Sequence, residues 1–497
     1  MKTVRTRVAP SPTGFPHVGT LYQALFDFVW AKKNEGKFIL RIEDTDAKRE
    51  VEGAEQAIFD AFSWAGLNAD EGPNSGGEFG PYRQSERLTL YKKYAEELIE
   101  KGFAYYCFCD ETRLETLRKE QEAKKLPPRY DRFCRDINPQ EAKKRVKAGE
   151  KACIRMKIPD HEKIKVTDLI RGEIEFDSDT LDDQVILKSD GFPTYHLAVV
   201  VDDHLMEISH AIRGEEWLPS APKHVLLYRY MNWVPPVFVH LPILRNPDHS
   251  KMSKRQGLTS VFWYRDEGYL PEALLNYLAS IVWNHPEGKE IFGIPDLIKY
   301  FEFKDMSYAA PIFDLTKLEW MSGVYLRGFS VEQFIDKMDE YRNRLGKRNL
   351  LETLGMEKLR KIIPLVQERI KKLSEFGPSV DFFFVSPHPL LVRYEYSLQA
   401  RYLDKIPEML DMMFDRFTKL SDFSAGSIHN SVNEIVTATG WKKADFCMMM
   451  RIAITGKTIS APLFESMEII GRDASFERLG KAKEVVIELI KDGQSQT

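Results

Sequence analysis

The N-terminal segment runs from strand to loop to helix to strand, which is the order of a parallel β-sheet unit. Residues 4–9 alternate in character, and the loop Pro10-Ser11-Pro12-Thr13-Gly14 cannot be helical, because two prolines and a glycine break it. From Val18 onward, apolar residues recur at the spacing of one helix face, and residues 37–42 form a second strand-like run. This order predicts a βαβ unit, and therefore a parallel sheet with helices on its faces.

The rest of the chain divides by the periodicity that it shows. Ser85 is the predicted N-cap of a helix that Gly102 closes, and residues 103–183 mix short strands with polar helices. After about residue 330, helical periodicity dominates. We therefore predict an α/β fold with a Rossmann-type parallel sheet, which an insertion interrupts and an all-helical C-terminal region follows. Beyond the insertion, strands are predicted at 184–188, 195–201, 210–213 and 237–244.

Composition limits the class of protein. The 497 residues are 43% hydrophobic and 29% charged, which is typical of a globular chain with several domains. No stretch approaches the roughly 18 apolar residues that span a bilayer, and the start lacks the apolar region of a secretory signal. We expect a cytoplasmic protein without a membrane partner. The net charge of −4 does not exclude a polyanion as partner, because a basic face can be local.

A histidine and a glycine stand at the predicted start of the first helix, in Pro16-His17-Val18-Gly19-Thr20. Free backbone N–H groups and the positive end of the helix dipole favour phosphate at such a place. His17 can donate a hydrogen bond to a phosphoryl oxygen as charge develops there. Taken alone, a histidine in this position is more often a structural cap.

A second motif, Lys251-Met252-Ser253-Lys254-Arg255, places three cations and a hydroxyl in five residues. Taken alone, it predicts an exposed basic loop. The alternative is a clamp for a polyphosphate leaving group, with lysines as point charges.

Together the two motifs resemble the paired motifs of class I aminoacyl-tRNA synthetases, HIGH for residues 17–20 and KMSKS for residues 251–255. Other segments narrow the resemblance to glutamyl-tRNA synthetases of bacterial type, and it extends from residue 6 to the end. These segments are 6–14, 41–46, 80–85, 189–197, 201–204 and 213–217.

The resemblance implies a domain division. It assigns 1–102 and 184–250 to the two halves of the Rossmann catalytic domain and 103–183 to an inserted acceptor-stem-binding subdomain. Residues 251–330 would hold the KMSKS-like loop and a helical stem-contact region. Residues 331–497 would form a helical anticodon-binding region.

The resemblance also implies an ATP-dependent ligase that loads glutamate onto tRNA. The glutamate α-carboxylate would attack the α-phosphorus of ATP, pyrophosphate would leave, and a terminal ribose hydroxyl of tRNA(Glu) would displace AMP. Mg²⁺ would bridge the leaving group, and His17, Lys251 and Lys254 would stabilise the charge that develops on the phosphates. No protein nucleophile is needed, so catalysis is positioning plus electrostatics. The implied ATP-binding residues are His17, Gly19, Thr20, Lys251, Ser253 and Lys254.

Glutamate carries two carboxylates and one ammonium group, so a selective pocket needs two cations and one anion. Arg7, Arg213 and Glu43 supply that set, and Tyr195 can donate a hydroxyl hydrogen bond. By the resemblance, Arg213 faces the γ-carboxylate, and a buried arginine fork would reject glutamine. Ser11 completes the implied set. Without the family context, Arg7 and Glu43 would be expected simply to pair across neighbouring strands.

The chain has five cysteines, an odd number that argues against a disulfide framework. Three thiolates close in sequence suit tetrahedral Zn²⁺, and the resemblance implies a structural zinc site that braces the insertion. The fourth ligand is Tyr130 or Asp136, with Tyr130 favoured, and three free cysteines without metal are the alternative. Cys153 and Cys447 are expected to be ordinary buried thiols. The three predicted cysteine ligands are Cys107, Cys109 and Cys134.

The helical C-terminal region matches the anticodon-binding region of bacterial-type members, where Arg369 is the candidate reader of a splayed base. The alternative for Arg369 is a solvated basic face. We expect a monomer whose partners are tRNA(Glu), L-glutamate and ATP, and the sequence leaves open whether tRNA(Gln) is also charged. A glutaminyl-tRNA synthetase would be expected to end in a β-barrel, and a truncated relative that glutamylates a tRNA base would lack the anticodon region. A catalytically dead RNA-binding paralogue would not need the intact His17, Lys251 and Lys254.

Overall fold

The computed structural model describes residues 3–46, 49–250, 252, 259–348 and 354–494. It divides into two units, one of residues 1–265 with 271–315 and one of residues 266–270 with 316–497. The predicted segment 251–330 is therefore shared between both units. Among the described helices, none combines the length and the apolar character that crossing a bilayer requires.

The predicted βαβ unit is confirmed. Strand β1 (Arg5–Val8) leads through the proline loop into helix α1 (Val18–Lys33), and β2 (Lys37–Leu40) pairs with β1 in parallel. Helix α1 begins at Val18 because His17 has extended backbone angles and caps it. The predicted apolar face of α1 is buried, from Val18 to Val29.

A second set of strands continues the sheet beside β1. Their order is β6 (Gly172–Asp177), β5 (Lys163–Asp168), β9 (Val237–Leu241) and β8 (His210–Gly214), and all except β6 run parallel. The amide of Ser209, just before β8, donates to the carbonyl of Arg5 at 2.9 Å, and Arg7 reaches the carbonyl of Ile212. β8 therefore lies beside β1 in the same direction, and their carboxyl ends meet at one edge.

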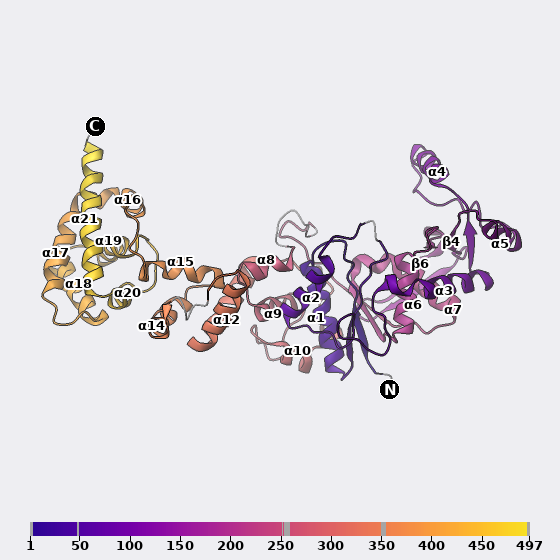
Figure 1. Cartoon of the computed structure of the whole chain (residues 1–497), viewed down its shortest axis with the longest axis horizontal. Coiled ribbons are helices and arrows are strands. Elements are labelled where there is room, and N and C mark those ends of the chain that lie inside the picture. The colour runs from indigo at the N-terminus through magenta and orange to yellow at the C-terminus, as the bar shows by residue number, and fades with distance from the viewer. Residues whose placement is uncertain (1–2, 47–48, 251, 253–258, 349–353, 495–497) are drawn as a thin grey trace. The chain divides into compact units, whose positions relative to one another are not determined.

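The insertion forms a separate antiparallel sheet in the order β3 (Ala104–Cys107), β4 (Cys153–Met156) and β7 (Val185–Leu187). Helices α4 (Glu111–Ala123) and α5 (Pro139–Lys147) connect β3 to β4. Both helices lie at the end of the insertion that is farther from α1 (Figure 1). The two sheets do not divide at residue 183, where the boundary of the insertion was predicted. β5 and β6 belong to the parallel sheet, whereas β7 joins the sheet of the insertion.

Two local predictions are wrong. Residues 195–201 were expected to be a strand but form helix α6 (Tyr195–Leu205). The run Leu197–Asp203 is buried along its whole length, so no exposed face reveals the helical period. Ser85 does not cap a helix: it lies in a 3₁₀ turn (Gln84–Arg87) before α3, and its side chain donates to Asp44 at 2.5 Å.

The remaining helices of the first unit cover the parallel sheet and extend beyond it. They are α2 (Ala54–Ala65), α3 (Leu88–Glu100), α7 (Ala221–Met231), α8 (Val261–Asp266), α9 (Pro271–Ser280) and α10 (Ile294–Tyr300). Helices α3, α6 and α7 share one core with β4, β5 and β9.

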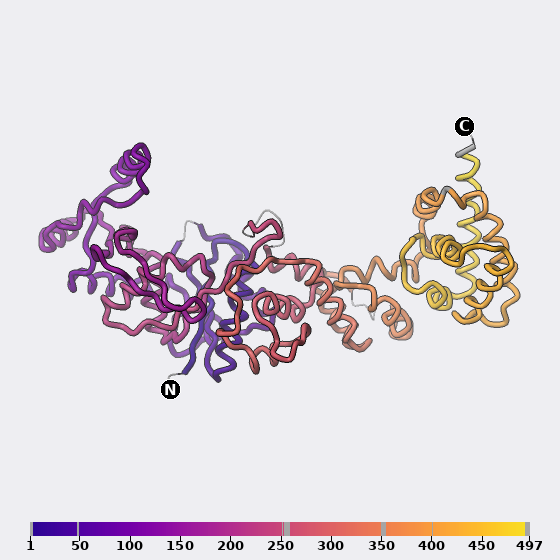
Figure 2. The backbone as a smooth tube through the Cα atoms, turned by 180° about the vertical axis from the view of Figure 1, so that it is seen from behind, coloured from indigo at the N-terminus to yellow at the C-terminus, as the bar shows by residue number. Residues whose placement is uncertain are grey.

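The second unit confirms the predicted helical region, because its described regular elements are all helices. Its last helix, α21, packs against α16, α17 and α19, and these helices share one apolar core. Figure 2 shows the orange-to-yellow end of the chain, which holds these helices, as one cluster of coils. The helices are α11 (Leu315–Arg327), α12 (Val331–Arg344), α14 (Met356–Gln367), α15 (Phe376–Val380), α16 (Pro389–Ser397), α17 (Ile406–Thr418), α18 (Ala425–Thr439), α19 (Lys443–Thr455), α20 (Leu463–Ile470) and α21 (Arg472–Gln494).

Candidate active site

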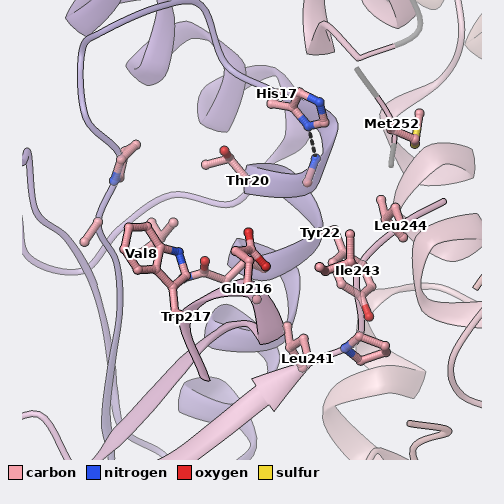
Figure 3. A pocket seen from close by; sticks show the side chains of 16 residues that line it. Val8, His17, Thr20, Tyr22, Glu216, Trp217, Leu241, Ile243, Leu244 and Met252 are labelled. Carbon is pink, nitrogen blue, oxygen red and sulfur yellow. Dashed lines mark hydrogen bonds between the residues drawn. The ribbon is translucent and has the colours of Figure 1, made fainter. Parts of the chain in front are cut away.

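A cavity of about 340 Å³ opens where the parallel strands end (Figure 3). Val8, Gly214 and Leu241, the last residues of β1, β8 and β9, all line it. Ligands in open parallel sheets bind at this edge, outside the carboxyl ends of the strands. The cavity is also lined by residues of the first turn of α1 and of the turn after β8, which include His17, Gly19, Thr20, Glu216 and Trp217.

His17 is both a helix cap and a wall of the cavity. Its Nδ1 accepts the amide proton of Gly19 at 2.9 Å, drawn as the dashed line in Figure 3. Because Nδ1 accepts, the neutral ring carries its proton on Nε2. A side chain at Gly19 would place its Cβ 3.2 Å from His17 Nδ1, so glycine keeps this turn tight. The structural reading of His17 as a cap is therefore correct, and it leaves Nε2 as the donor nitrogen.

Of the second motif, the described residue Met252 lies at the same cavity. Met252 is buried and lines the cavity opposite the first turn of α1. After the undescribed stretch, Thr259 accepts the amide of Val18 at 2.7 Å, and Val261 donates to the carbonyl of Pro16 at 3.1 Å. Met252 of the second motif therefore lines the same cavity as His17 and Thr20 of the first. The predicted residues Lys251, Ser253 and Lys254 lie outside the described residues.

Two members of the predicted glutamate set lie near the ends of β1 and β2, where Arg7 is buried and Glu43 is half-buried. Arg7 donates through Nε to Asp203 at 2.9 Å, whereas Glu43 accepts from Arg41 at 3.1 Å. The alternative of a simple Arg7–Glu43 pair is wrong, because each has its own partner of opposite charge. Burial raises the pKa of Glu43, although the guanidinium of Arg41 opposes that rise. Ser11 is exposed on the loop before α1.

Arg213 and Tyr195, the other two members, contact each other. Arg213 is 3% exposed at the end of β8, and its Nη1 donates to the Tyr195 hydroxyl at 3.1 Å. The same nitrogen donates to His224 Nδ1 at 3.1 Å, and Nε donates to His240 Nε2 at 3.0 Å. Its Nη2 is buried and has no hydrogen-bond partner among the described residues. The sequence analysis missed both histidines, which come from α7 and β9.

The predicted cysteines converge at the base of α4. The sulfur atoms of Cys107, Cys109 and Cys134 all lie within 4.8 Å of one another. The hydroxyl of Tyr130 lies 3.3 Å from the Cys107 sulfur and 3.4 Å from the Cys109 sulfur. The alternative ligand Asp136 is exposed and is not among the grouped side chains. This donor set of three sulfurs and one phenol oxygen is compatible with tetrahedral Zn²⁺.

The cysteines that were expected to be ordinary are half-buried. Cys153 faces Cys107 across the β3–β4 pair, and Cys447 lies in α19.

Hydrogen bonds from Cys153 and then from Tyr130 lower the pKa of the Cys107 thiol to about 4, whereas burial raises the pKa of the Cys109 thiol to about 12. The thiol of Cys107 therefore loses its proton more readily than the thiol of Cys109.

In the second unit, Arg369 is exposed just after α14. Its charge acts on Arg451 of α19, whose pKa is lowered first by burial and then by the positive charge of Arg369. Arg451 donates to the Ser460 hydroxyl at 2.7 Å and to the carbonyl of Ala461 at 3.0 Å. No ion pair with a carboxylate is found for either arginine in the described part of the chain. Arg451 was not predicted from the sequence, where it stands between the apolar residues Met450 and Ile452 of α19.

Known proteins match the chain along its whole length. A family model described as "tRNA synthetases class I (E and Q), catalytic domain" matches residues 3–320, and one for an anticodon binding domain matches residues 333–483. The glutamate–tRNA ligase of Acidothermus cellulolyticus is 44% identical over 97% of this chain and 95% of its own. That of Stutzerimonas stutzeri is 44% identical over 98% of this chain and 96% of its own. The chain belongs to the glutamate–tRNA ligase family of class I tRNA synthetases.

Solved structures of class I tRNA synthetases agree with this assignment. The crystal structure of a glutamate tRNA ligase from Elizabethkingia meningosepticum, in complex with its amino acid, matches with a TM-score of 0.82 and 35% identity. The match covers 97% of this chain and 99% of that one. The predicted family and the α/β fold with a helical C-terminal region are confirmed. Two alternatives are excluded, because the helical anticodon-binding region is present. They are a glutaminyl-tRNA synthetase that ends in a β-barrel and the truncated relative that glutamylates a tRNA base.

Proposed function

We propose that this chain is a glutamate–tRNA ligase that activates L-glutamate with ATP and transfers it to the 3′ end of tRNA(Glu). The observation that carries the choice of amino acid is Arg213. A buried guanidinium without a carboxylate partner is unfavourable unless a ligand supplies the anion. A glutamate γ-carboxylate would accept from Nη2 of Arg213 and from the Tyr195 hydroxyl, which already accepts from Arg213 and is left to donate.

ATP would occupy the cavity at the strand ends, bound as its magnesium complex. The start of α1 presents the positive end of the helix dipole, which favours phosphate, and His17 carries on Nε2 a ring proton that it can donate. The cavity volume of about 340 Å³ is in the range of small-molecule sites. Gly19 and Thr20 would contact the nucleotide, and the sequence assigns Lys251, Ser253 and Lys254 to the phosphates of the leaving group.

The cysteine cluster would hold a structural zinc ion through Cys107, Cys109, Cys134 and Tyr130. The ion would act as a cross-link. Helix α4 contains no buried residue, so a metal ion bound to Cys109, just before the helix, would help to fix its position. The site would thereby brace the insertion that meets the acceptor end of the tRNA.

The helical unit would bind the anticodon, with Arg369 and Arg451 as cations that form no ion pair within the described part of the chain. Splayed bases and phosphates are met by such arginines in RNA-binding sites. We place the activity in the cytoplasm, where tRNA, ATP and glutamate occur together, and expect the enzyme to act as a monomer.

The test is aminoacylation of purified tRNA for glutamate and tRNA for glutamine, each with either amino acid. Glutamate should be charged to tRNA(Glu), and glutamine should not be charged to either tRNA. ATP–pyrophosphate exchange that depends on glutamate and tRNA would separate an enzyme from an inactive RNA-binding protein. Charging of tRNA(Gln) with glutamate would identify a non-discriminating enzyme, whereas failure to charge tRNA(Glu) would refute the proposal.

A further inference from the structure

All hydrogen-bond partners of the Arg213 guanidinium are electrically neutral groups. They are one phenol and two imidazoles, at 3.0–3.1 Å. In the described part of the chain, no carboxylate forms an ion pair with Arg213. The neighbouring buried arginines differ in this respect, because Arg7 and Arg41 both contact Asp203, at 2.9 and 2.7 Å. Unlike Arg7 and Arg41, Arg213 therefore has no carboxylate partner among the described residues, and a ligand could supply one.

The arginine also sets the tautomer of both imidazoles. Arginine has only donors, so each ring nitrogen that faces it must accept. His240 then accepts at Nε2 and carries its proton on Nδ1, which donates to Asp168 at 2.6 Å. His224 accepts at Nδ1 and carries its proton on Nε2, which donates to His196 Nδ1 at 3.1 Å. Both rings are thereby held in one orientation.

Asp168 holds the ring of His240 in place, and burial keeps both imidazole rings neutral. Asp168 is fully buried, and its carboxylate also accepts the amides of Ile170, Arg171 and His240 at 2.9–3.0 Å. Burial lowers the pKa of His240, against the effect of its bond to Asp168. Burial and the charge of Arg213 hold the pKa of His224 well below its ordinary value.

We propose that His224 and His240 are positioning residues that determine specificity for an anionic amino-acid side chain. They fix the Arg213 fork with neutral acceptors, so that its charge is balanced only when a substrate carboxylate arrives at Nη2. An acidic residue at either position would hold the fork equally well, but it would neutralise the charge that distinguishes glutamate from glutamine. This inference rests on the proposed function, because it takes Arg213 to be the residue that meets the γ-carboxylate.

The decisive comparison is His224→Asn with His224→Asp, two side chains of nearly equal size. Each places an oxygen acceptor where Nδ1 now faces Arg213, and only the aspartate adds a charge. With tRNA present, the KM for glutamate in pyrophosphate exchange should be at least about tenfold higher in His224→Asp than in His224→Asn, with a smaller difference in kcat. The preference for glutamate over glutamine, as a ratio of kcat/KM, should fall by a similar factor.

A second pair covers the case that His224→Asp does not fold, which thermal unfolding would reveal. His240→Gln keeps an acceptor near the position of Nε2, whereas His240→Met keeps the volume without a good acceptor. The methionine variant should have the higher KM for glutamate, again by about tenfold, with equal melting temperatures for the two variants. Equal KM values within both pairs would overturn the inference. Absence of glutamate-dependent exchange in the unaltered enzyme would instead overturn the proposed function.

Discussion

The hydroxyl of Tyr195, the first residue of α6, accepts a hydrogen bond of 3.1 Å from Nη1 of Arg213 at the end of β8. This contact joins a strand end to a helix start across the parallel sheet. The tyrosine ring also packs on Trp217, with ring centroids 4.3 Å apart, and Trp217 lines the cavity at the strand ends. One aromatic pair therefore connects the proposed amino-acid site at Arg213 with the cavity.

Replacing Arg213 tests the amino-acid site. Arg213→Ala should lower kcat/KM for glutamate by about 100-fold or more, because the substrate carboxylate would be buried without its partner. Activity with glutamine should fall much less, so the selectivity should be lost. Arg229→Ala is the matched control, since Arg229 is an exposed arginine paired with Glu162. Unchanged selectivity in Arg213→Ala would refute the assignment of Arg213.

Two substitutions at His17 separate its structural role from a catalytic one. His17→Asn retains a good helix cap but removes the Nε2 donor, whereas His17→Ala removes both. We expect kcat to fall by about 100-fold in both variants. Only His17→Ala should also lose about 1 kcal/mol in the free energy of unfolding. Full kcat in His17→Asn would show that His17 acts only as a cap.

The sequence predicted those features that are local in the chain. The βαβ order and the start of α1 at Val18 each depend on a few neighbouring residues. Helix α6 was missed, because a run of buried apolar residues has no polar face and its valines favour strands.

The environment of Arg213 was missed for a different reason. Its supporting residues Asp168, His224 and His240 come from β5, α7 and β9, and no spacing along the chain relates them. Lone histidines are usually ordinary core or surface residues, so their meaning appears only once the sheet brings them to one guanidinium. The sequence pattern likewise does not specify which strands pair. It therefore did not predict that β5 and β6 join the parallel sheet or that β7 joins the sheet of the insertion.

Metal analysis tests the cysteine cluster. The purified chain should contain about one zinc ion per molecule, as expected of a closed tetrahedral site. Cys134→Ala should lose the metal, and Tyr130→Phe should hold it more weakly, because each removes one of four ligands. Cys447→Ala should keep it, since that half-buried cysteine lies in α19 of the other unit. A chain without zinc after expression in zinc-supplemented medium would contradict the site.

The pair Arg369 and Arg451 gives a prediction for tRNA binding. Arg369 and Arg451 form no ion pair with a carboxylate among the described residues, and the charge of Arg369 lowers the pKa of Arg451, so an RNA phosphate near them would relieve this repulsion. Replacing both by alanine should weaken the affinity for tRNA(Glu) by about tenfold or more and lower its dependence on salt. At saturating tRNA, the kcat for charging should change little, since neither residue belongs to the catalytic unit. Arg416→Ala is the control, because Arg416 is exposed in the same unit but pairs with Glu434 at 2.6 Å. Equal affinities in the double variant, the control and the unaltered chain would exclude this arginine pair from the tRNA contact.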